Sequence, residues 1–294
     1  MISRTKIKRS IMGHLISPLL SLSRRGSSGW MVIVGLVIVI AIVVMTALAP
    51  WISPHNPIAP VGPIRQPPSL EFPMGTDHLR RDMLSRVISG GSVMLQVSAF
   101  SVALCFMLGV PLGLFSSYTG GYFDRAASLV VDAVYAFPGL VIAIAVAAML
   151  GPGVVNMALS IAVVYIPSYF RIVRSQVLTI KELTYVEAAR AAGAKWYTVL
   201  YRYVLPNVIP SIVIVATINF ADAILTAAGL TFVGLGGTYD IPDWGWDLTD
   251  GRKYLLSGAW WIITFPGLMI ILLALGFTLI GEGLSELLNP KLQR

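Results

Sequence analysis

The chain has 294 residues, of which 56% are hydrophobic and 12% are charged. Soluble domains carry roughly a quarter charged residues. This composition, with a mean hydropathy of +0.79, therefore excludes an ordinary soluble protein and indicates an integral membrane protein. The net charge of +7 does not indicate nucleic-acid binding, because the basic residues lie between apolar runs, as they do at the flanks of membrane-spanning helices.

Six apolar runs are long enough to cross a lipid bilayer, which takes about 20 residues at roughly 1.5 Å per residue. In chain order they cover residues 30–49, 92–117, 126–150, 154–170, 208–232 and 259–281. The first run is too long for the core of a signal peptide and has no clear cleavage site after it, so we expect it to be retained as a helix. The expected fold class is all-α, a polytopic membrane protein with six transmembrane helices.

The lysines and arginines predict how these helices are oriented. If the N-terminus is cytosolic, the cytosolic segments hold 15 of the 21 basic residues and the outer segments hold 6. Both termini are therefore expected in the cytosol. The predicted organisation is a basic cytosolic tail over 1–29, the first helix over 30–49, an outer loop over 50–91, a five-helix core over 92–284 with a cytosolic loop at 174–207, and a cytosolic tail over 285–294.

The two longer outer loops differ in composition. The first has eight prolines between residues 50 and 73 and should be extended and semi-rigid rather than a folded domain. Its end, 77–89, has apolar residues at helical spacing, which predicts a helix lying on the membrane surface. The second loop has two tryptophans that suit a membrane interface and several acids that form a solvated face or contact an external partner: Asp240, Asp243, Trp244, Trp246, Asp247 and Asp250.

A polar, basic segment between the fourth and fifth runs predicts a short, rigid helix. Thr184 and Glu187 have the spacing of a capping box, in which each side chain bonds to the backbone N–H of the other residue. Alanines follow, and Gly193 can adopt the left-handed conformation that ends a helix. A second helical stretch over 195–204 should end before Pro206. From these features alone, an ordinary amphipathic loop helix is as good an interpretation as a docking surface.

The full spacing is more specific. Glu187-Ala188-Ala189, then Gly193, then Leu205-Pro206 resembles the signature loop of the membrane subunits of ABC importers, although Tyr203 stands where that pattern usually has isoleucine. FPMGTD at 72–77 with RDMLSR at 81–86, and LTFVGLG at 230–236 with PDWG at 242–245, resemble the loops after the first and fifth spans of dipeptide and oligopeptide (nickel) importer permeases. This family often has a glutamate where Ala227 stands. The resemblance covers most of the chain from residue 30.

The resemblance implies a division of labour in a prokaryotic plasma (inner) membrane. The type I ABC importer permease fold is expected, with these partners: a second homologous permease subunit, two cytosolic ATPase subunits, an extracytoplasmic solute-binding protein and the lipid bilayer. The residues expected to couple this chain to an ATPase are Thr184, Glu187, Ala188, Ala189, Gly193, Leu205 and Pro206. No cofactor is expected on this chain, because it lacks a G-x-x-x-x-G-K-[ST] phosphate loop; ATP and Mg would bind the ATPases.

Two acids, Asp132 and Asp222, lie inside apolar runs, where a charge is expensive and often functional. We expect Asp132 to act in a gate or in a hydrogen bond between helices, and Asp222, near the centre of the fifth run, to line the solute pathway. A purely structural hydrogen bond is the alternative for each. A proton relay is a further alternative, but these acids have no lysine or histidine partner within the runs.

Other functions find less support in the sequence. The histidines at 14, 55 and 78 lack the spacing of metal ligands, and no serine, cysteine or carboxylate pair suggests catalysis, so we expect no metal site and no enzyme. The expected solutes are dipeptides or oligopeptides, with nickel complexes or glutathione-like compounds as alternatives. An ion-gradient-driven transporter would usually show inverted repeats, which we do not find, and a membrane scaffold without transport is the remaining rival.

Overall fold

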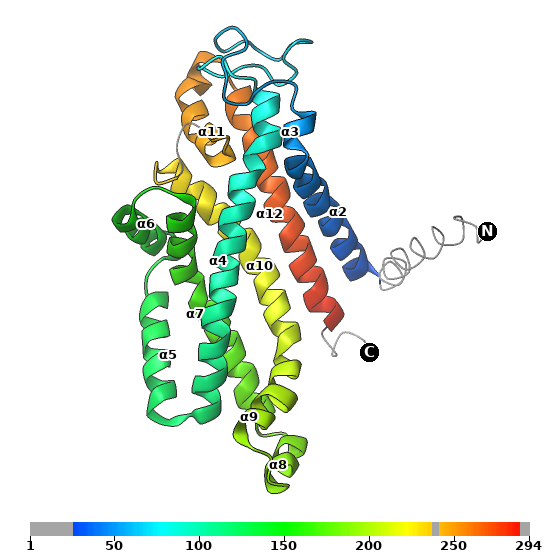
Figure 1. The fold of residues 1–294 in the computed structure, drawn as a ribbon, viewed down its shortest axis with the longest axis vertical. Helices are drawn as coiled ribbons and strands as arrows, with labels where there is room; N and C mark the ends of the chain where they lie inside the picture. The colour runs from blue at the N-terminus through cyan, green and yellow to red at the C-terminus, as the bar shows by residue number, and fades with distance from the viewer. Residues whose placement is uncertain (1–25, 237–240, 289–294) are drawn as a thin grey trace, which may run out of the picture.

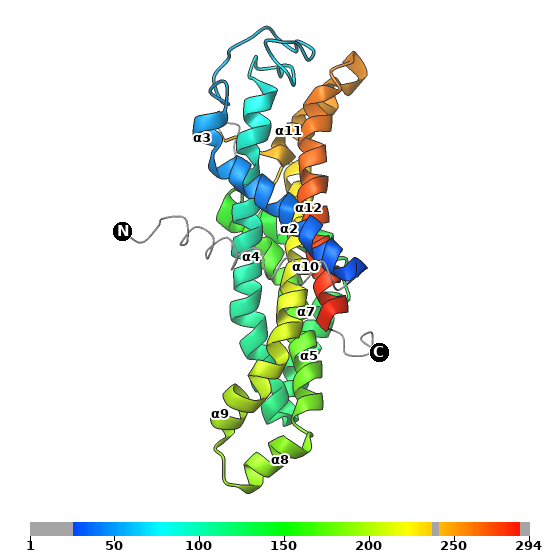
Figure 2. The same ribbon diagram turned by 90° about the vertical axis from the view of Figure 1, so that its right-hand side faces the viewer.

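The computed structural model describes residues 26–236 and 241–288, and these form an elongated bundle of helices (Figures 1 and 2). The helices that build the bundle are α2 (Ser27–Ala47), α3 (Ala49–Ile52), α4 (Met83–Thr119), α5 (Gly121–Tyr135), α6 (Gly139–Leu150), α7 (Val154–Ile180), α8 (Thr184–Ala191), α9 (Trp196–Thr198), α10 (Leu205–Phe232), α11 (Trp244–Gly251) and α12 (Trp261–Leu288). A π-helical turn, η1 (Val199–Val204), joins α9 to α10, and a 3-10 helix, η2 (Arg252–Ser257), follows α11.

The all-α fold with six membrane spans is confirmed. Among the described residues, five helical segments are long and apolar enough to cross a membrane, and α5 with α6 makes a sixth span if the bent pair is counted as one. Several spans are longer than predicted: α7 continues to Ile180 and α12 to Leu288. Helix α12 thus includes the first residues of the tail expected over 285–294, and the basic tail over 1–29 lies almost wholly outside the described residues.

The third predicted run is a bent pair rather than one straight helix. α5 and α6 meet at 92° across a short break, and α6 projects sideways from the bundle (Figure 1). Pro138 explains the break, since proline has no N–H to donate and forces the preceding residue, here Phe137, out of the α-helical region. Pro138 is itself extended, with ψ 125°, and α6 begins directly after it.

The surface helix predicted over 77–89 is wrong. The helix there begins at Met83 and is the first part of α4, so it includes residues assigned to the predicted outer loop over 50–91. Asp82 caps it by accepting hydrogen bonds from the backbone N–H groups of Leu84 and Ser85. Met83 and Val87 are buried against protein instead of facing lipid, because the second outer loop folds over this end of α4.

Helix α2, the first span, packs against α12, the last span. Gly35 of α2 lies so close to Gly276 of α12 that an added Cβ would come within 2.5 Å of the Gly276 carbonyl oxygen. Ser28 near the start of α2 also donates a hydrogen bond to Glu286 near the end of α12. The start of α2 and the end of α12 thus lie at one level, and α4, α7 and α10 extend well beyond it to carry α8 and α9 (Figure 1).

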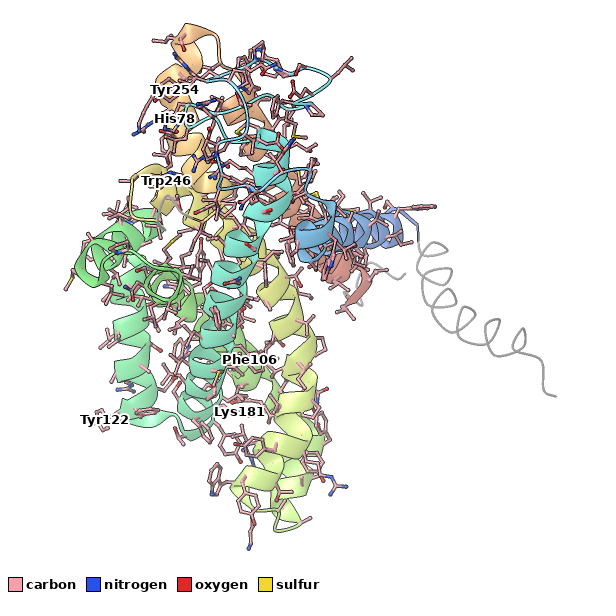
Figure 3. The ribbon with its side chains drawn as sticks, turned by 45° about the horizontal axis from the view of Figure 1, so that its top comes forward. His78, Phe106, Tyr122, Lys181, Trp246 and Tyr254 are labelled. Carbon is pink, nitrogen blue, oxygen red and sulfur yellow. The ribbon has the colours of Figure 1, made fainter. Side chains whose placement is uncertain are left out.

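The end of the bundle that carries the two predicted outer loops is a compact cap, called the outer cap below. Its end is marked by His78 and Tyr254, which stack with ring centroids 5.2 Å apart, whereas Tyr122 and Lys181 mark the opposite end (Figure 3). The loop before α4 folds around Thr76, whose hydroxyl donates to the carbonyl oxygen of Pro63 (2.6 Å) and accepts from the N–H of Gln66 (2.8 Å). The predicted extended first loop is therefore folded in its second half.

The expectation that the acids of the second outer loop form a solvated face is wrong. Asp243, Asp247 and Asp250 are only 2%, 3% and 4% exposed; Asp240 lies outside the described residues. Asp247 forms an ion pair with fully buried Arg86 of α4, with nitrogen–oxygen distances of 2.6 and 2.8 Å. Trp244 is also fully buried and donates its indole N–H to the carbonyl oxygen of Val87. These contacts fasten α11 to α4.

Asp243 makes the stability of this cap depend on pH. Burial, more than any other cause, raises the pKa of the Asp243 carboxyl from its usual value near 4 to about 7, although it accepts a hydrogen bond from the N–H of Gly245. Between about pH 4 and pH 7, the Asp243 carboxyl therefore holds a proton in the folded cap that it releases in the unfolded chain. Its stability should fall as pH rises from about 4 to about 7 and then stay level.

Replacing Asp243 with asparagine should remove that dependence. We expect Asp243→Asn to unfold at a midpoint temperature close to that of the unmodified chain at pH 4, and at a progressively higher one up to pH 7. Thermal unfolding of the purified protein across this range measures the difference. A constant difference at all pH values would show that Asp243 does not titrate in this window.

Candidate functional site: a projecting helix and a polar cavity

The projecting helix α8 begins one residue earlier than a capping box requires. Its N-cap is Leu183, which has an extended conformation (ψ 141°), and Thr184 is already helical. No side chain caps this helix, so the predicted capping box between Thr184 and Glu187 is wrong. The N–H groups of Val186 and Glu187 donate instead to the carbonyl oxygen of Leu183, at 2.8 and 3.2 Å. Glu187 still lies in the first turn, where its charge suits the helix dipole.

The end of α8 is built as the sequence predicts. Gly193 has φ +82°, in the left-handed region. The N–H of Gly193 donates to the carbonyl oxygen of Arg190 (2.9 Å), and the N–H of Ala194 donates to that of Ala189 (3.0 Å). These two hydrogen bonds form a Schellman motif, which satisfies carbonyl groups that the helix leaves unpaired and turns the chain sharply. The direction of the chain after α8 therefore depends on one glycine.

Residues outside the predicted set hold α8 in place. Val186 is fully buried in a cluster with Ile180, Val199 and Leu200. Asn207 of α10 donates a hydrogen bond to the hydroxyl oxygen of Tyr185, on α8, at 3.2 Å. The burial of Val186 could have been predicted, because it is the apolar residue beside the Glu-Ala-Ala motif. The role of Asn207 could not, because its partner is 22 residues away. Thus α8 is bound to the bundle on one side.

The opposite side of α8 is exposed and consists mostly of small side chains. Among the predicted coupling residues, Thr184, Glu187, Ala188 and Gly193 are exposed and Ala189 is partly buried. Methyl groups, a glycine and one carboxylate leave room for another surface to approach the backbone closely. Leu205 and Pro206 do not belong to this face: Leu205 packs against the inner core, and Pro206 is exposed at the start of α10. The structure thus separates the predicted coupling residues into an exposed group on α8 and a pair at the start of α10.

The predicted stop before Pro206 is wrong. The chain is helical without interruption from Trp196 to Phe232, a length of 37 residues. The π-helical turn η1 lies just before the proline. Proline cannot donate the hydrogen bond that an α-helix needs at that position, and a local change of helix type accommodates the missing donor. The segment that follows the turn at Gly193 is consequently continuous with a membrane span, while α8 itself is separated from it by that turn.

A polar cavity lies where α5, α6, α7 and α10 meet. Its volume is about 440 Å³. The polar groups on its wall come from α7 and α10, and Tyr135 and Phe137 come from the bend between α5 and α6. Asp222, the predicted pathway residue, is among them and lies in the middle of α10. Such a cavity among core spans has the size of small-molecule sites.

The second predicted acid, Asp132, lies outside this cavity. Its side chain is 61% exposed and forms an ion pair with Arg171 of α7 at 2.7 Å. Arg171 also lies over the ring of Tyr135, 3.9 Å from its centre. Arg171 lies just beyond the fourth predicted run, which ends at residue 170, and the longer α7 carries it within reach of Asp132. A second ion pair, between Asp124 and Arg174, joins the same two helices at 2.6 and 2.9 Å.

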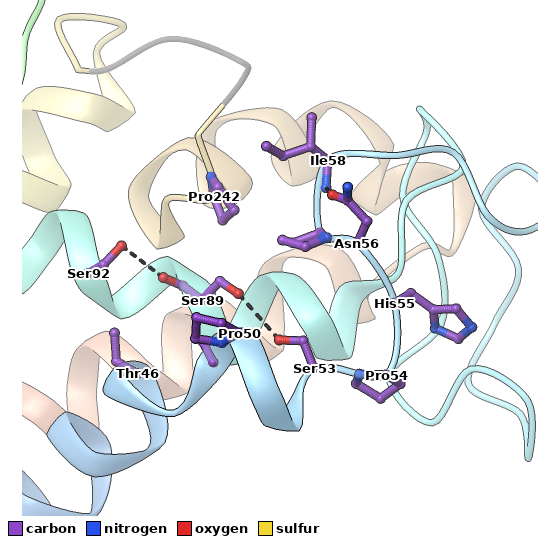
Figure 4. A pocket seen from close by; sticks show the side chains of 12 residues that line it. Thr46, Pro50, Ser53, Pro54, His55, Asn56, Ile58, Ser89, Ser92 and Pro242 are labelled. Atoms are coloured by element: carbon purple, nitrogen blue, oxygen red, sulfur yellow. Dashed lines mark hydrogen bonds between the residues drawn. The ribbon is translucent and has the colours of Figure 1, made fainter.

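A larger cavity of about 670 Å³ lies at the outer ends of α2 and α4 (Figure 4). Ser53, Ser89 and Ser92 form a row along it: the hydroxyl oxygens of Ser53 and Ser89 are 3.5 Å apart, and Ser92 donates to the carbonyl oxygen of Ser89. Within the described part of the chain, no lysine, arginine or carboxylate lines this cavity. It lies beside the first span and the cap rather than among the core spans, so it is a less suitable route through the bundle.

Comparisons with known proteins agree with these features. The family described as "Binding-protein-dependent transport system inner membrane component" matches residues 109–294. The family described as "N-terminal TM domain of oligopeptide transport permease C" matches residues 27–68. The matched regions contain the first span, α8 and the cavity.

Curated relatives are similar over most of the chain. The dipeptide transport system permease protein DppC of Alkalihalophilus pseudofirmus is 38% identical over 263 residues, covering 89% of this chain and 86% of that protein. The di/tripeptide transport system permease protein DppC of Pseudomonas aeruginosa is 38% identical over 269 residues, covering 88% of each. The glutathione transport system permease protein GsiD of Pectobacterium atrosepticum is 39% identical over 230 residues, covering 78% of this chain and 76% of that protein.

These matches, together with the helical fold, establish the role of this chain in transport. It is a permease subunit of an ABC transporter in the inner membrane, and it is not an enzyme, because the ATPase is a separate subunit. The rival interpretations as an ion-gradient-driven transporter or a scaffold are not favoured. The chain belongs to the family of inner-membrane components of binding-protein-dependent transport systems.

Proposed function

We propose that this chain is one of two membrane subunits of an importer for dipeptides or oligopeptides. Relatives whose names specify dipeptides and di/tripeptides match most of its length, which favours a peptide over other solutes. A glutathione permease also matches, so a glutathione-like compound is the second candidate. The observation that carries the proposal is α8: an exposed, small-residue face on a helix that packs, through Val186 and the Tyr185–Asn207 hydrogen bond, against the helix bearing Asp222.

The face of α8 formed by Glu187, Ala188, Ala189 and Gly193 would dock in a groove on a cytosolic ATPase. In the proposed assembly there are two ATPases, which bind ATP and Mg, a second homologous permease and an outer solute-binding protein. When the ATPases close on ATP, they move α8. Because α8 is anchored to α10 by Asn207 and by the buried Val186, the span moves with it. Alternation between two such arrangements opens the pathway to one side at a time.

The cavity that contains Asp222 would form part of the solute pathway, completed by the second permease. The ion pair between Asp132 and Arg171 would act as a gate toward the cytosolic side, because it joins α5 to α7 and is half exposed. Opening such a pair costs little when water can reach both charges. In this orientation both termini are cytosolic, as the distribution of basic residues predicts.

A cysteine cross-link tests the docking face. Ala189→Cys should form a disulfide-length cross-link with a cysteine in the groove of the ATPase when the complex is treated with an oxidant in membranes. The substitution replaces one small side chain with another, and Ala189 is partly buried at the edge of the exposed face. Gel electrophoresis under non-reducing conditions measures the product, and ATP should change its yield.

Two controls make this experiment decisive. Pro206→Cys, exposed on α10 rather than on α8, should give little product with the same ATPase cysteine. Labelling of Ala189→Cys by an impermeant thiol reagent should require that the membrane be opened. Labelling from the outer side of intact cells would refute both the orientation and the docking role.

A further inference from the structure

The Asp222 carboxylate is unpaired in the described structure. It lines the cavity between α7 and α10 and is partly buried. Among the residues that the structure describes, no side chain forms an ion pair or hydrogen bond with this carboxylate; the hydroxyl of Thr226 donates to the backbone oxygen of Asp222 instead. Asp124 and Asp132, the acids on α5, both have arginine partners. Asp222 thus differs from both acids of α5.

The polar neighbours of Asp222 have other partners. Asn219, Asp222 and Thr226 follow helical spacing on α10, so they lie on one face. The hydroxyl oxygens of Thr226 and Tyr165 are 2.9 Å apart, and the amide of Asn219 donates to the hydroxyl oxygen of Ser168 at 2.6 Å. These bonds cross from α10 to α7 on either side of Asp222. They hold the cavity wall together and leave the carboxylate facing the cavity as its one charged group.

A carboxylate without a partner is costly at membrane depth, and a cation relieves that cost. The cavity also presents the aromatic ring of Phe137, whose face attracts cations, while Arg171 already covers one face of the Tyr135 ring. Its other polar side chains on α7 and α10 bond to one another, the remaining lining is mostly apolar, and among the described residues no second charge lies there to bind a particular side chain. This combination favours a ligand with one positive group on a variable apolar body. A volume of about 440 Å³ admits the end of a short peptide but not a long chain.

We propose that Asp222 binds the protonated α-amino group of the solute as it passes through the membrane. This inference rests on the proposed peptide function for the identity of the solute, while the cation site itself rests on the cavity. The carboxylate would accept the ammonium hydrogen bonds, and the apolar wall would take side chains of different shapes. A peptide would then be recognised by a feature that all free peptides share.

The charge can be measured without transport. In the assembled complex in membranes, with Cys105→Ser to remove the chain's one cysteine, Val164→Cys places a thiol on the cavity wall. We expect it to react faster with a cationic methanethiosulfonate than with an anionic one of similar size. Asp222→Asn should lower that rate ratio by about tenfold, since a single nearby charge dominates the local potential, and Asp222→Glu should preserve it.

Recognition of the α-amino group is tested by whether a peptide protects the Val164→Cys thiol from modification. Millimolar dialanine should slow the modification of Val164→Cys, whereas N-acetyl-dialanine should not, and Asp222→Asn should abolish the difference. If the rate ratio is the same with Asp222→Asn, or if neither reagent reaches the thiol, the cation site is refuted. Leu140→Cys, on the same cavity wall, serves as a second reporter in case Val164→Cys does not accumulate.

The outcomes separate this inference from the proposed function. Equal protection by the free and the acetylated peptide would refute recognition of the amine while leaving peptide transport intact. Protection by ethylammonium but not by dialanine, together with no dialanine uptake by the unmodified complex, would refute the peptide function and retain the cation site.

Discussion

Gly193→Val is expected to lower ATP-driven solute uptake at least about fivefold without reducing the amount of protein in the membrane. Gly193 ends α8 at φ +82°, and an added Cβ would meet no atom within 4 Å. The effect is therefore due to backbone strain rather than to a clash. A β-branched residue in the left-handed region costs about 1–2 kcal/mol, which changes a conformational equilibrium about 5–30-fold. Uptake of labelled solute by reconstituted complexes, normalised to protein, measures the loss.

Gly193→Asn is the matched control, because asparagine adds a side chain of similar size and tolerates the left-handed conformation. It should retain most of the uptake. ATP hydrolysis should continue in Gly193→Val, since the ATPase is a separate subunit, so the ratio of ATP hydrolysed to solute imported should rise. Full uptake by Gly193→Val would mean that the geometry of the end of α8 does not matter for coupling.

Arg86→Met is expected to have the largest effect on stability of any single change in the outer cap. The Arg86 side chain is fully buried, forms an ion pair with Asp247 and donates a second hydrogen bond to the carbonyl oxygen of Pro57 (3.1 Å). Removing it leaves the Asp247 carboxylate buried without its partner, which costs about 3–5 kcal/mol. The midpoint of thermal unfolding of the purified complex should fall by on the order of 10 °C.

The double variant Arg86→Met with Asp247→Leu provides the control. Since it removes both charges and keeps apolar volume between α4 and α11, it should recover most of the lost stability. Asp247→Leu alone should be destabilising, because it leaves Arg86 unpaired. If the double variant is as unstable as the sum of the two single variants, the ion pair is not what fastens α11 to α4.

Local sequence features predicted well those elements that depend on neighbours in the chain. Apolar runs alone locate the spans, because every backbone polar group in a bilayer must be satisfied within a helix. Gly193 could be predicted because the left-handed end of α8 depends on one residue's own steric freedom. The prediction of a capping box failed at the same helix, which begins at Thr184 with Leu183 as its N-cap although threonine is the better capping residue, and which buries Val186 against η1.

In the candidate site too, single residues could be predicted from the sequence, but their neighbours in space could not. Asp222 could be selected from sequence because an acid in an apolar run is conspicuous. Its cavity could not, since the wall combines residues from four helices. The partner of Asp132 was also hidden: Arg171 is 39 residues away, and it came within reach because α5 bends away at Pro138 while α7 continues past the predicted end of its span.

The sequence by itself determined that this chain crosses a membrane as helices, that a small-residue helix lies between its fourth and fifth spans, and that glycine ends that helix. These properties depend on hydrophobicity and on local backbone freedom. Only the tertiary structure decided that Arg86 meets Asp247, 161 residues apart, that the outer acids are buried, and that Asp222 faces a cavity without a partner. Such outcomes depend on which surfaces pack together, and the energy of packing is shared among distant residues that no local pattern records.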